Sequence, residues 1–223
     1  MTDPTRRFDA VLFDMDGVLV DSEHHWNSIR AAYAAARGRP WGIDDQHAVM
    51  GANSRQWATT MRDRLGLAES PDAIGADIVA SVVARFHAGG IPVIPGAPEA
   101  VRRIAARLPV AIASSAHADV IAAAVDALGL HGVFGAVTSS DEVPHGKPEP
   151  DVYRLAAERL GVAPERCLVV EDSTNGVLAG KAAGAFVVLI PNANVPPTPL
   201  AFESADVVVE CLGDLDLDAL PLI

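Results

Sequence analysis

Cysteine, aromatic residues, basic residues and long apolar runs are all scarce in this sequence. The chain of 223 residues has two cysteines, Cys167 and Cys211, which lie far apart in the sequence. This excludes a fold held together by disulfides and predicts buried free thiols, as in a reducing compartment. No segment approaches the ~20 apolar residues of a membrane-spanning helix. The segment from Met1 to Asp9 is polar and lacks the apolar centre of a signal peptide. We therefore expect a cytoplasmic protein without a membrane partner.

Basic residues are outnumbered by acidic ones, 17 against 29, and the formal net charge is -12. This balance argues against nucleic acids and anionic membrane surfaces as partners, because both are bound through basic surfaces. An anionic small molecule would need positive charge concentrated at one place. Hydrophobic residues make up 50% of the chain, which is enough to build one large domain or a domain with an insert. At this size we expect a monomer.

Short β-rich runs alternate with segments of helical length. This alternation is typical of a Rossmann-like α/β fold with a doubly wound parallel sheet and right-handed crossovers. The predicted strands are Ala10–Asp14, Val110–Ser114, Val133–Ser139, Cys167–Glu171, Phe186–Ile190 and Val207–Val209. The predicted helices between the later strands are Ala118–Gly129, Asp151–Gly161 and Asn175–Gly184, each ending at a glycine suited to a helix C-cap.

The long interval between the first two strands, residues 21–91, contains no convincing strand. Its helix-forming segments are Ser22–Ala36, Ser54–Leu65 and Ser70–Ala88, each opening with a possible N-cap residue. Glycines and prolines in residues 89–96 mark a boundary. We therefore predict an α/β core, residues 1–20 and 92–223, with an inserted all-α cap, residues 21–91, placed as a lid.

Two carboxylates separated by one residue end the first apolar run, in Phe13-Asp14-Met15-Asp16-Gly17. In a strand, residues i and i+2 share a face, so Asp14 and Asp16 would point the same way, and Gly17 would let the chain turn. At ~4 Å and an effective dielectric of ~20, two such charges repel by about 4 kcal/mol. A cation, a proton or a basic side chain must offset this repulsion.

Further polar groups end the later strands or lie in the loops behind them: Ser114, Lys147, Glu171 and Asp172. The carboxyl ends of parallel strands meet at one edge of a sheet, where ligands bind. Carboxylates there suit a hard divalent cation, and Mg²⁺ is the expected ion for an oxygen-only site that also holds phosphate. Lys147 can bind a phosphoryl group, as can Ser114, which lies just before a predicted helix whose N-terminal amides favour anions.

These motifs together resemble the haloacid dehalogenase-like superfamily of hydrolases, in the branch that includes β-phosphoglucomutase and small sugar-phosphate phosphatases. The resemblance covers nearly the whole chain. Its motifs stand here as Phe13-Asp14-Met15-Asp16-Gly17-Val18-Leu19-Val20-Asp21-Ser22-Glu23, Ile112-Ala113-Ser114-Ser115, Gly146-Lys147-Pro148-Glu149-Pro150-Asp151 and Val170-Glu171-Asp172-Ser173-Thr174-Asn175-Gly176.

The resemblance implies a role for each of these core residues. Asp14 would be the nucleophile that forms an aspartyl-phosphate, and Asp16 would be the acid and then the base. Mg²⁺ would be bound by the Asp14 side chain, the Asp16 carbonyl and Asp172, with Glu171 nearby or acting through water. Mg²⁺ and Lys147 would keep Asp14 ionised, whereas crowding by anions would raise the pKa of Asp16. Ser114, Ser115 and Lys147 would grip the phosphoryl oxygens.

In the cap, we place Ser22, Trp26 and Arg55 near the substrate. Arg55 resembles the cap arginine with which β-phosphoglucomutase holds its second phosphate. Trp26 departs from the family pattern, because the mutase has a histidine there, and this disfavours return of the phosphoryl group to a sugar. The roles of the four histidines nearest these motifs stay open: His24, His25, His117 and His145.

The function expected from these residues is that of a Mg²⁺-dependent phosphatase acting on a small phosphorylated metabolite, such as a sugar phosphate. A phosphomutase with the same first half-reaction is the nearest alternative. A dehalogenase would leave Asp16 and the Glu171-Asp172 pair unexplained. A non-catalytic module that binds phosphorylated metabolites is the alternative of another class, and filled catalytic positions argue against it.

Overall fold

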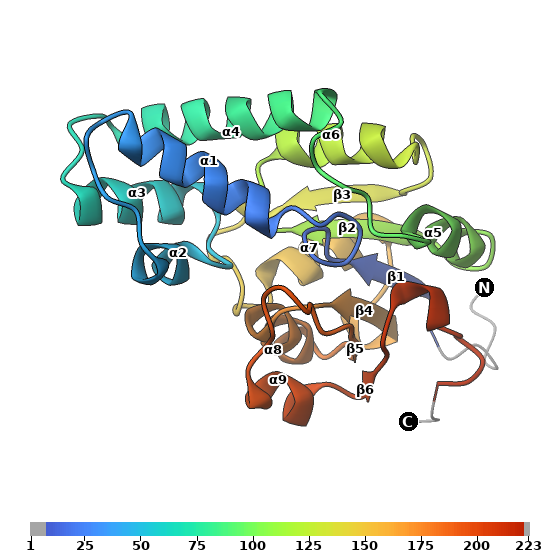
Figure 1. Cartoon of the computed structure of the whole chain (residues 1–223). Coiled ribbons are helices and arrows are strands. Elements are labelled where there is room, and N and C mark those ends of the chain that lie inside the picture. Colours follow the sequence, from blue (N-terminus) through green and yellow to red (C-terminus); the bar gives the residue numbers. More distant parts are fainter. Residues whose placement is uncertain (1–7, 221–223) are drawn as a thin grey trace.

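Within residues 8–220, six parallel strands form a single sheet in the order β3-β2-β1-β4-β5-β6 (Figure 1). Strand β1 lies at the centre, and the chain winds outward from it in both directions, so β1 and β4 flank the point where the strand order reverses. The predicted doubly wound sheet is confirmed. The strands are β1 (Ala10–Phe13), β2 (Val110–Ser114), β3 (Ala136–Ser139), β4 (Cys167–Glu171), β5 (Phe186–Leu189) and β6 (Val207–Val208).

The computed structural model describes residues 8–220, so most of the leading segment predicted from Met1 to Asp9 lies outside the described residues. Four predicted strand boundaries were wrong. Strands β5 and β6 each end one residue earlier than predicted, at Leu189 and Val208. Strand β3 begins at Ala136 because Val133 lies in a turn, where its N–H donates to the Leu130 carbonyl at 3.2 Å. Strand β1 ends at Phe13, one residue before Asp14, although the Asp14 N–H still donates to the Val170 carbonyl at 2.9 Å.

Alternate residues of each central strand pack on opposite faces of the sheet. In β1, Val11 and Phe13 belong to one apolar cluster, and Ala10 and Leu12 belong to the other. Helices α5 and α6 cover the first face, and α7, α8 and α9 cover the second. Buried alanines are frequent on the second face, which lets its helices lie close to the sheet. The covering helices are α5 (Ala97–Ala105), α6 (Ala118–Leu128), α7 (Asp151–Leu160), α8 (Thr174–Ala183) and α9 (Pro199–Ser204).

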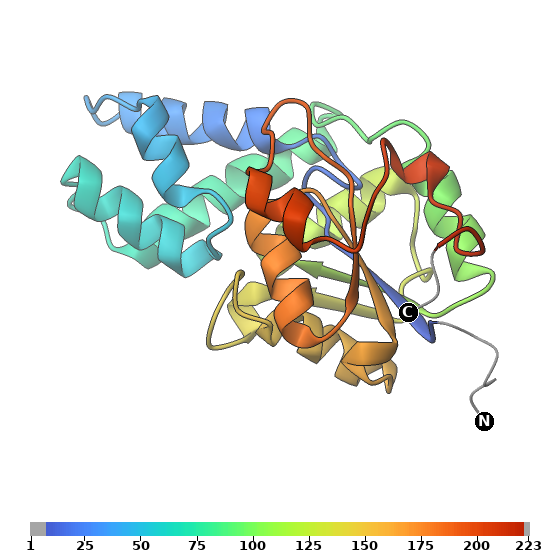
Figure 2. The same ribbon diagram turned by 90° about the horizontal axis from the view of Figure 1, so that it is seen from below.

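Four of the five helices between β1 and β2 form a group of their own: α1 (Glu23–Ala35), α2 (Ile43–Val49), α3 (Ser54–Leu65) and α4 (Pro71–His87). They group together beside the sheet in both views (Figures 1 and 2). The chain enters and leaves this group side by side, because Asp21 donates its N–H to Pro92 and Ile94 donates to Leu19. This pairing supports the boundary expected at residues 20–21 and 91–92, and the cap as a separate domain stays a prediction.

Three helices were absent from the prediction: α2, α5 and α9. Helices α2 and α9 have 7 and 6 residues, too short for a clear periodic pattern. Both cysteines are free, as predicted, but only Cys167 is buried, whereas Cys211 is exposed beyond the last strand. Within residues 8–220, no helix combines the length and apolar character needed to cross a bilayer.

Candidate active site

The carboxyl edge of the sheet collects the acids and the lysine that the sequence motifs contain. A cavity of about 250 Å³ opens at this edge, between the core loops and the α1–α4 helices. Its polar residues from the core include Asp14, Asp16, Ser115, Lys147 and Asp172. Its walls on the other side come from α1, α3 and the segment 49–52. The sheet topology therefore builds one site from residues that lie more than a hundred positions apart.

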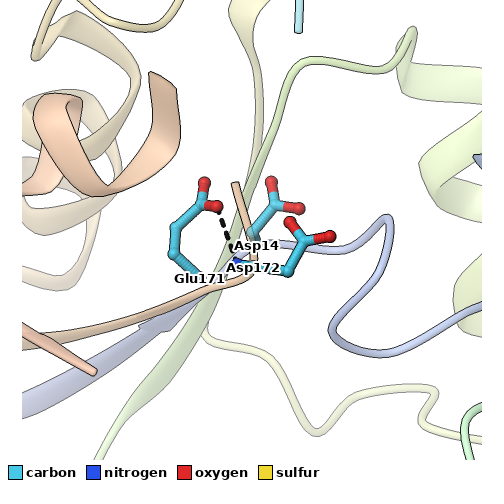
Figure 3. A group of neighbouring side chains, drawn as sticks. All are labelled: Asp14, Glu171 and Asp172. Atoms are coloured by element: carbon cyan, nitrogen blue, oxygen red, sulfur yellow. Dashed lines mark hydrogen bonds between the residues drawn. The ribbon is translucent and has the colours of Figure 1, made fainter. Parts of the chain in front are cut away.

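Three buried carboxylates face one another at the centre of this edge (Figure 3). Asp14, Glu171 and Asp172 each offer an oxygen, and these oxygens lie within 4.8 Å of one another. Gly17 makes this approach possible, because its φ is +82° and a Cβ there would lie 1.8 Å from the Asp172 carboxylate. Three negative charges this close require a cation or protons to be stable.

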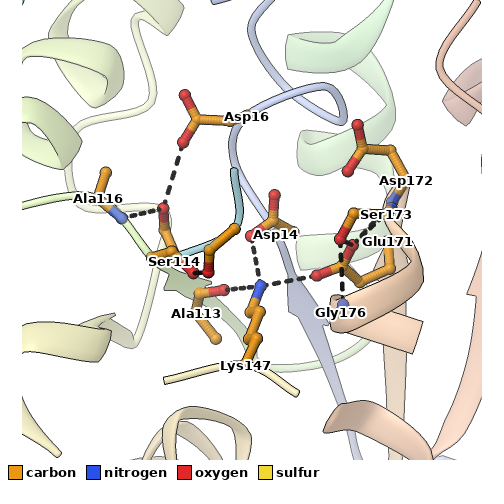
Figure 4. A network of polar contacts seen from close by, with 12 residues as sticks. Asp14, Asp16, Ala113, Ser114, Ala116, Lys147, Glu171, Asp172, Ser173 and Gly176 are labelled. Atoms are coloured by element: carbon orange, nitrogen blue, oxygen red, sulfur yellow. Dashed lines mark hydrogen bonds and ion pairs between the residues drawn. The ribbon is translucent and has the colours of Figure 1, made fainter. Parts of the chain in front are cut away.

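Lys147 supplies part of the required positive charge (Figure 4). Its Nζ donates to Oδ1 of Asp14 at 2.5 Å, to Oε1 of Glu171 at 2.7 Å and to the Ala113 carbonyl at 3.1 Å. Burial lowers the pKa of Lys147, but the two carboxylates outweigh burial, so its pKa is raised and the ammonium stays charged. The lysine therefore anchors two of the three acids.

The predicted ionisation of Asp14 depends on Mg²⁺ together with Lys147 and stays a prediction. Burial raises the pKa of Asp14 to about 8, even though the Lys147 ammonium opposes this shift, and Glu171 and Asp16 raise it further. One lysine is thus too little positive charge to keep Asp14 ionised at neutral pH. A further cation at this point would lower that pKa.

Glu171 connects Lys147 to Tyr153 and to the backbone at the start of α8. Its Oε1 also accepts from the Tyr153 hydroxyl at 2.7 Å, and its Oε2 accepts the N–H groups of Asp172 and Ser173 at 2.9 and 3.0 Å. The pKa of Glu171 is lowered because Lys147 and these donors outweigh burial. Both of its oxygens are therefore occupied by donors of the protein, and the geometry favours the indirect role for Glu171.

Asp172 has fewer partners than Glu171. The Asn192 amide donates to its Oδ2 at 3.2 Å. Burial and the neighbouring charges of Glu171 and Asp14 raise its pKa well above the usual range. Asp172 and Asp14 are therefore the two side chains of this group that most need a cation.

Asp16 is directed to a different set of partners from Asp14, although the two acids share the cavity. Its Oδ1 accepts from the Ser22 hydroxyl and from the Trp26 indole, the latter at 3.1 Å. The Ser114 hydroxyl donates to its Oδ2 at 3.5 Å (Figure 4). Loss of hydration raises its pKa, and the Ser22 and Trp26 hydrogen bonds oppose the shift. The expected rise is present, but its main cause is burial and not crowding by anions.

Ser22 and Trp26, which we predict to lie near the substrate, both contact Asp16. Ser22 is buried against Asp16, and Trp26 lines the cavity while its N–H is given to the same carboxylate. Ser114 is fully buried and its Oγ accepts the Ala116 N–H at 3.1 Å. Ser115 lines the cavity and donates to the Gly51 carbonyl at 3.3 Å, joining the core to the α2–α3 segment. Three of these four side chains therefore contact protein groups around Asp16.

The structure does not bring Arg55 to the acids. Arg55 is exposed and lines a separate groove of about 1130 Å³ between α3, α4 and the core, and His117 lines this groove as well. The Nδ1 of His117 accepts the Asp119 N–H as a helix cap. His24 and His25 border a third hollow on α1, and His145 is exposed and pairs with Asp151 at 3.1 Å.

Arg30 is a basic residue of the cavity that the sequence analysis missed. It lines the same cavity as Asp14 and Asp16, from helix α1. Its position four residues after Trp26 places it on the same face of the helix, which is the signal that was available. Tyr153 and Asn192 were also missed, because they reach Glu171 and Asp172 only through tertiary packing.

The donor set suits a hard divalent cation. Its side-chain ligands would be carboxylate oxygens alone, they are buried, and Lys147 leaves their negative charge only partly compensated. Sulfur and imidazole ligands, which a zinc site would favour, are absent from this group of described residues. The residues present therefore fit Mg²⁺.

The fold is a doubly wound α/β fold, and its clustered acids and lysine lie at the carboxyl edge of the parallel sheet, where ligands bind in such folds. The model of the haloacid dehalogenase-like hydrolase family matches residues 8–184, and the chain belongs to this family. The resemblance inferred from the motifs is thereby confirmed.

Individual relatives carry phosphatase names. Hexitol phosphatase A of Escherichia coli K12 is 30% identical over 220 residues, covering 96% of both chains. The bifunctional riboflavin kinase/FMN phosphatase of Arabidopsis thaliana is 33% identical over 94% of this chain, which spans 55% of that protein. Among solved structures, a mutant of CbbY from Rhodobacter sphaeroides in complex with xylulose-(1,5)bisphosphate is similar, with TM-score 0.82 and 25% identity over 96% and 100% of the chains.

Proposed function

We propose that this protein is a Mg²⁺-dependent phosphatase that hydrolyses a small phosphorylated metabolite through an aspartyl-phosphate on Asp14. The observation that carries the proposal is the division of the acids. Lys147 and the carboxylate cluster hold Asp14, whereas Ser22, Trp26 and Ser114 hold Asp16 apart from it. Two acids with different surroundings can have different protonation states, as nucleophilic attack and proton transfer require. The hexitol phosphatase relative supports the choice of a sugar phosphate as substrate.

The metal would be held by the side chains of Asp14 and Asp172 and by the Asp16 carbonyl, with Glu171 placed behind them. When bound, Mg²⁺ supplies positive charge that stabilises the transferring phosphoryl group and keeps Asp14 ionised. Glu171 would act through Lys147, because its oxygens accept from Lys147, Tyr153 and backbone N–H groups. This assignment makes Glu171 a positioning residue.

In the first step, an Asp14 carboxylate oxygen attacks phosphorus, and the bond from phosphorus to the ester oxygen breaks. Asp16 gives its proton to that departing oxygen, so the alcohol leaves neutral. In the second step, ionised Asp16 takes a proton from water, whose oxygen attacks phosphorus. The bond to Asp14 breaks, and both carboxyl groups return to their starting states with release of inorganic phosphate.

Positive charge and hydrogen-bond donors around the phosphoryl group belong to the core. The Lys147 ammonium lies 2.5 Å from Asp14, within reach of a phosphoryl group bonded to that side chain. Ser115 lines the cavity, and fully buried Ser114 lies behind it, near Asp16. Such donors stabilise charge that grows on the phosphoryl oxygens in the transition state.

Water, rather than a second hydroxyl of the substrate, is the proposed acceptor. A mutase must return the phosphoryl group to a sugar, and the position of its cap histidine is filled here by Trp26, whose N–H is already given to Asp16. An indole cannot exchange a proton at neutral pH, so this side chain can orient Asp16 but cannot take part in proton transfer.

Phosphate release from a panel of sugar, polyol and acid monophosphates tests the proposal. We expect turnover with Mg²⁺, none with EDTA, and none from the Asp14→Asn variant. When wild-type protein is incubated with Mg²⁺ and a substrate from the panel labelled in its phosphate, acid quenching should trap radiolabelled phosphate on the chain. The Asp14→Asn variant should trap none. An isomerised phosphate ester in place of free phosphate would establish the mutase, and ligand binding without turnover would establish the binding module.

A further inference from the structure

Arg30 is a buried cation whose hydrogen-bonding capacity is poorly used. It is 5% exposed, and its guanidinium carbon lies 5.0 Å from the ring centre of Trp26 and 5.3 Å from that of Trp57. Its Nε finds no hydrogen-bond partner among residues 8–220. Its Nη1 donates to the neutral Gln46 amide oxygen at 3.4 Å, a long bond. A guanidinium has five N–H donors, and buried donors are normally paired.

The guanidinium of Arg30 lines the catalytic cavity. Arg30, Trp26 and Trp57 form part of one wall, and Asp14 and Lys147 form part of the core side. Arg30 therefore borders the space that is open to a ligand whose phosphoryl group sits at Asp14. Burial lowers the pKa of Arg30 to about 10, so it stays charged at neutral pH.

Two carboxylates, those of Glu23 and Asp16, lie near enough to Arg30 to oppose the effect of burial on its pKa. Glu23 is linked to Arg30 through Gln46, whose amide nitrogen lies 3.4 Å from Oε2 of Glu23. The neutral amide separates the two charges, and Glu23 lines the cavity itself. Arg30 therefore faces the cavity with charge and donors that a ligand can use.

We propose that Arg30 binds a second oxyanion of the substrate, a carboxylate or a phosphate, at the end away from the phosphoryl group that is cleaved. This inference rests on the proposed function and narrows its substrate to phosphate esters with an anionic tail. Arginine suits such a group because its planar fork matches a carboxylate or phosphate with two parallel hydrogen bonds. The two indoles hold the fork in place and so reduce the entropy lost on binding.

The role assigned to Arg30 is the one that the sequence suggested for Arg55. The two arginines differ in where they lie, because Arg55 is exposed in the groove between α3 and α4 whereas Arg30 is buried in the acid cavity. Recognition of the tail therefore belongs to α1, the helix that also carries the Trp26 contact to Asp16.

Calorimetric binding to the Asp14→Asn variant with Mg²⁺ tests the proposal, since this variant should leave the ligands intact. The ligand pairs are 3-phosphoglycerate with glycerol 3-phosphate, and fructose 1,6-bisphosphate with fructose 6-phosphate. In at least one pair the anionic-tail member should bind about tenfold tighter or more. The carboxylate pair and the phosphate pair tell which oxyanion is preferred.

When Arg30→Met is combined with Asp14→Asn, the preference for the anionic-tail ligand should fall to about twofold or less. Arg30→Lys should keep part of this preference, because lysine retains the charge without the planar fork. Arg62→Met is the matched control, since Arg62 lies on the exposed face of α3 and pairs with Asp63, and it should leave the preference unchanged. Equal binding of both members in both pairs would overturn the proposal even if the Arg30 variants do not fold. A preference that survives Arg30→Met, or that is lost in Arg55→Met instead, would also overturn it.

Turnover by the wild-type protein, which keeps Asp14, separates this proposal from the proposed function. Phosphate release with equal kcat/KM and equal affinity for both members of each pair leaves the phosphatase standing and removes the role of Arg30. Tighter, Arg30-dependent binding of the anionic-tail ligands without phosphate release from any ester supports the role of Arg30 and removes the phosphatase.

Discussion

The indole N–H of Trp26 donates to Oδ1 of Asp16 at 3.1 Å and thereby connects helix α1 to the proposed proton donor of the core. The Ser22 hydroxyl donates to the same oxygen. Both donors favour the ionised form of Asp16 and oppose the effect of burial on its pKa. The start of helix α1 thus lowers the pKa of Asp16 relative to the value that burial alone would give.

Trp26→Phe should raise the pKa of Asp16, because a hydrogen bond to the ionised carboxylate is lost while the burial stays. Because Asp16 must carry a proton to protonate the departing oxygen, the basic limb of the pH profile of kcat/KM should then move to higher pH. General acid and base catalysis contributes about 10²- to 10⁴-fold, so loss of part of it should lower kcat at neutral pH by about tenfold. Trp41→Phe is the control, because the Trp41 indole donates to Asn27 and not to an acid. An unshifted limb in Trp26→Phe would contradict this role.

Lys147→Met should impair both stability and turnover. It leaves Asp14 and Glu171 buried without their shared cation, a change that costs about 3–5 kcal/mol when one member of a buried pair is removed. We expect kcat/KM to fall by about 10²-fold or more, as for other electrostatic groups that contact the reacting atoms. Urea unfolding and steady-state kinetics measure the two effects.

Lys181→Met is the matched control for the lysine. Lys181 pairs with Asp206 at 2.6 Å, but its side chain is 36% exposed, and such surface pairs contribute about 0.2–1 kcal/mol. A loss of stability in Lys147→Met no larger than that in Lys181→Met would show that the buried pairs do not hold the site together.

Stabilisation by Mg²⁺ should increase with pH. Burial raises the pKa of Asp14 from its usual 3.8 to about 8, so between these values the folded protein keeps a proton that the unfolded chain has lost. With EDTA this group therefore lowers the free energy of unfolding as the pH rises, and its effect levels off above about 8. Mg²⁺ binds the ionised carboxylate, so its affinity and the resulting rise in Tm should grow over the same range.

Thermal unfolding with EDTA and with saturating Mg²⁺, from about pH 5.5 to about pH 8.5, measures this dependence. Asp172→Asn should remove most of the Mg²⁺-induced rise in Tm, because it deletes a proposed ligand. A rise of the same size at every pH would mean that ionisation of Asp14 is not linked to metal binding.

Gly176→Ala should destabilise the protein, although alanine is the better helix former by about 0.8–1 kcal/mol. Gly176 lies in α8, and a Cβ there would come within 1.6 Å of Oε1 of Glu171. Glu171 would have to leave Lys147 and Tyr153, so we expect a loss of about 1–3 kcal/mol and lower kcat. Urea unfolding measures the first effect and phosphate release the second.

Gly75→Ala is the control, because it should change the free energy of unfolding in the opposite direction. Gly75 lies in α4, and the nearest atom to a Cβ there is the Ala58 Cβ at 3.9 Å, an ordinary contact. Alanine at this position should stabilise the protein by about 0.5–1 kcal/mol. If Gly176→Ala also stabilised the protein, the close fit between α8 and Glu171 would have no energetic consequence.

Much of the fold and the core of the site could be predicted because their signals are local. The apolar runs that become β1, β2 and β4 are short and are followed closely by polar residues, and their order along the chain specifies a parallel sheet. Once the sheet is parallel, Asp14, Ser114 and Asp172 must meet at one edge. Helices α2 and α9 escaped prediction because one or two turns carry too weak a periodic signal.

The sequence by itself determined which residues reach the carboxyl edge of the sheet, since strand order and the residues at strand ends are local properties. Only the tertiary structure decided their partners. It turned Ser22 and Trp26 toward Asp16, placed Glu171 behind Lys147, left Arg55 outside the cavity and brought Arg30 into it. The physical reason is that side-chain pairing depends on how α1–α4 pack over the sheet. Even the contacts of Ser22 and Trp26 with Asp16, which lies 6 and 10 residues away, depend on this packing.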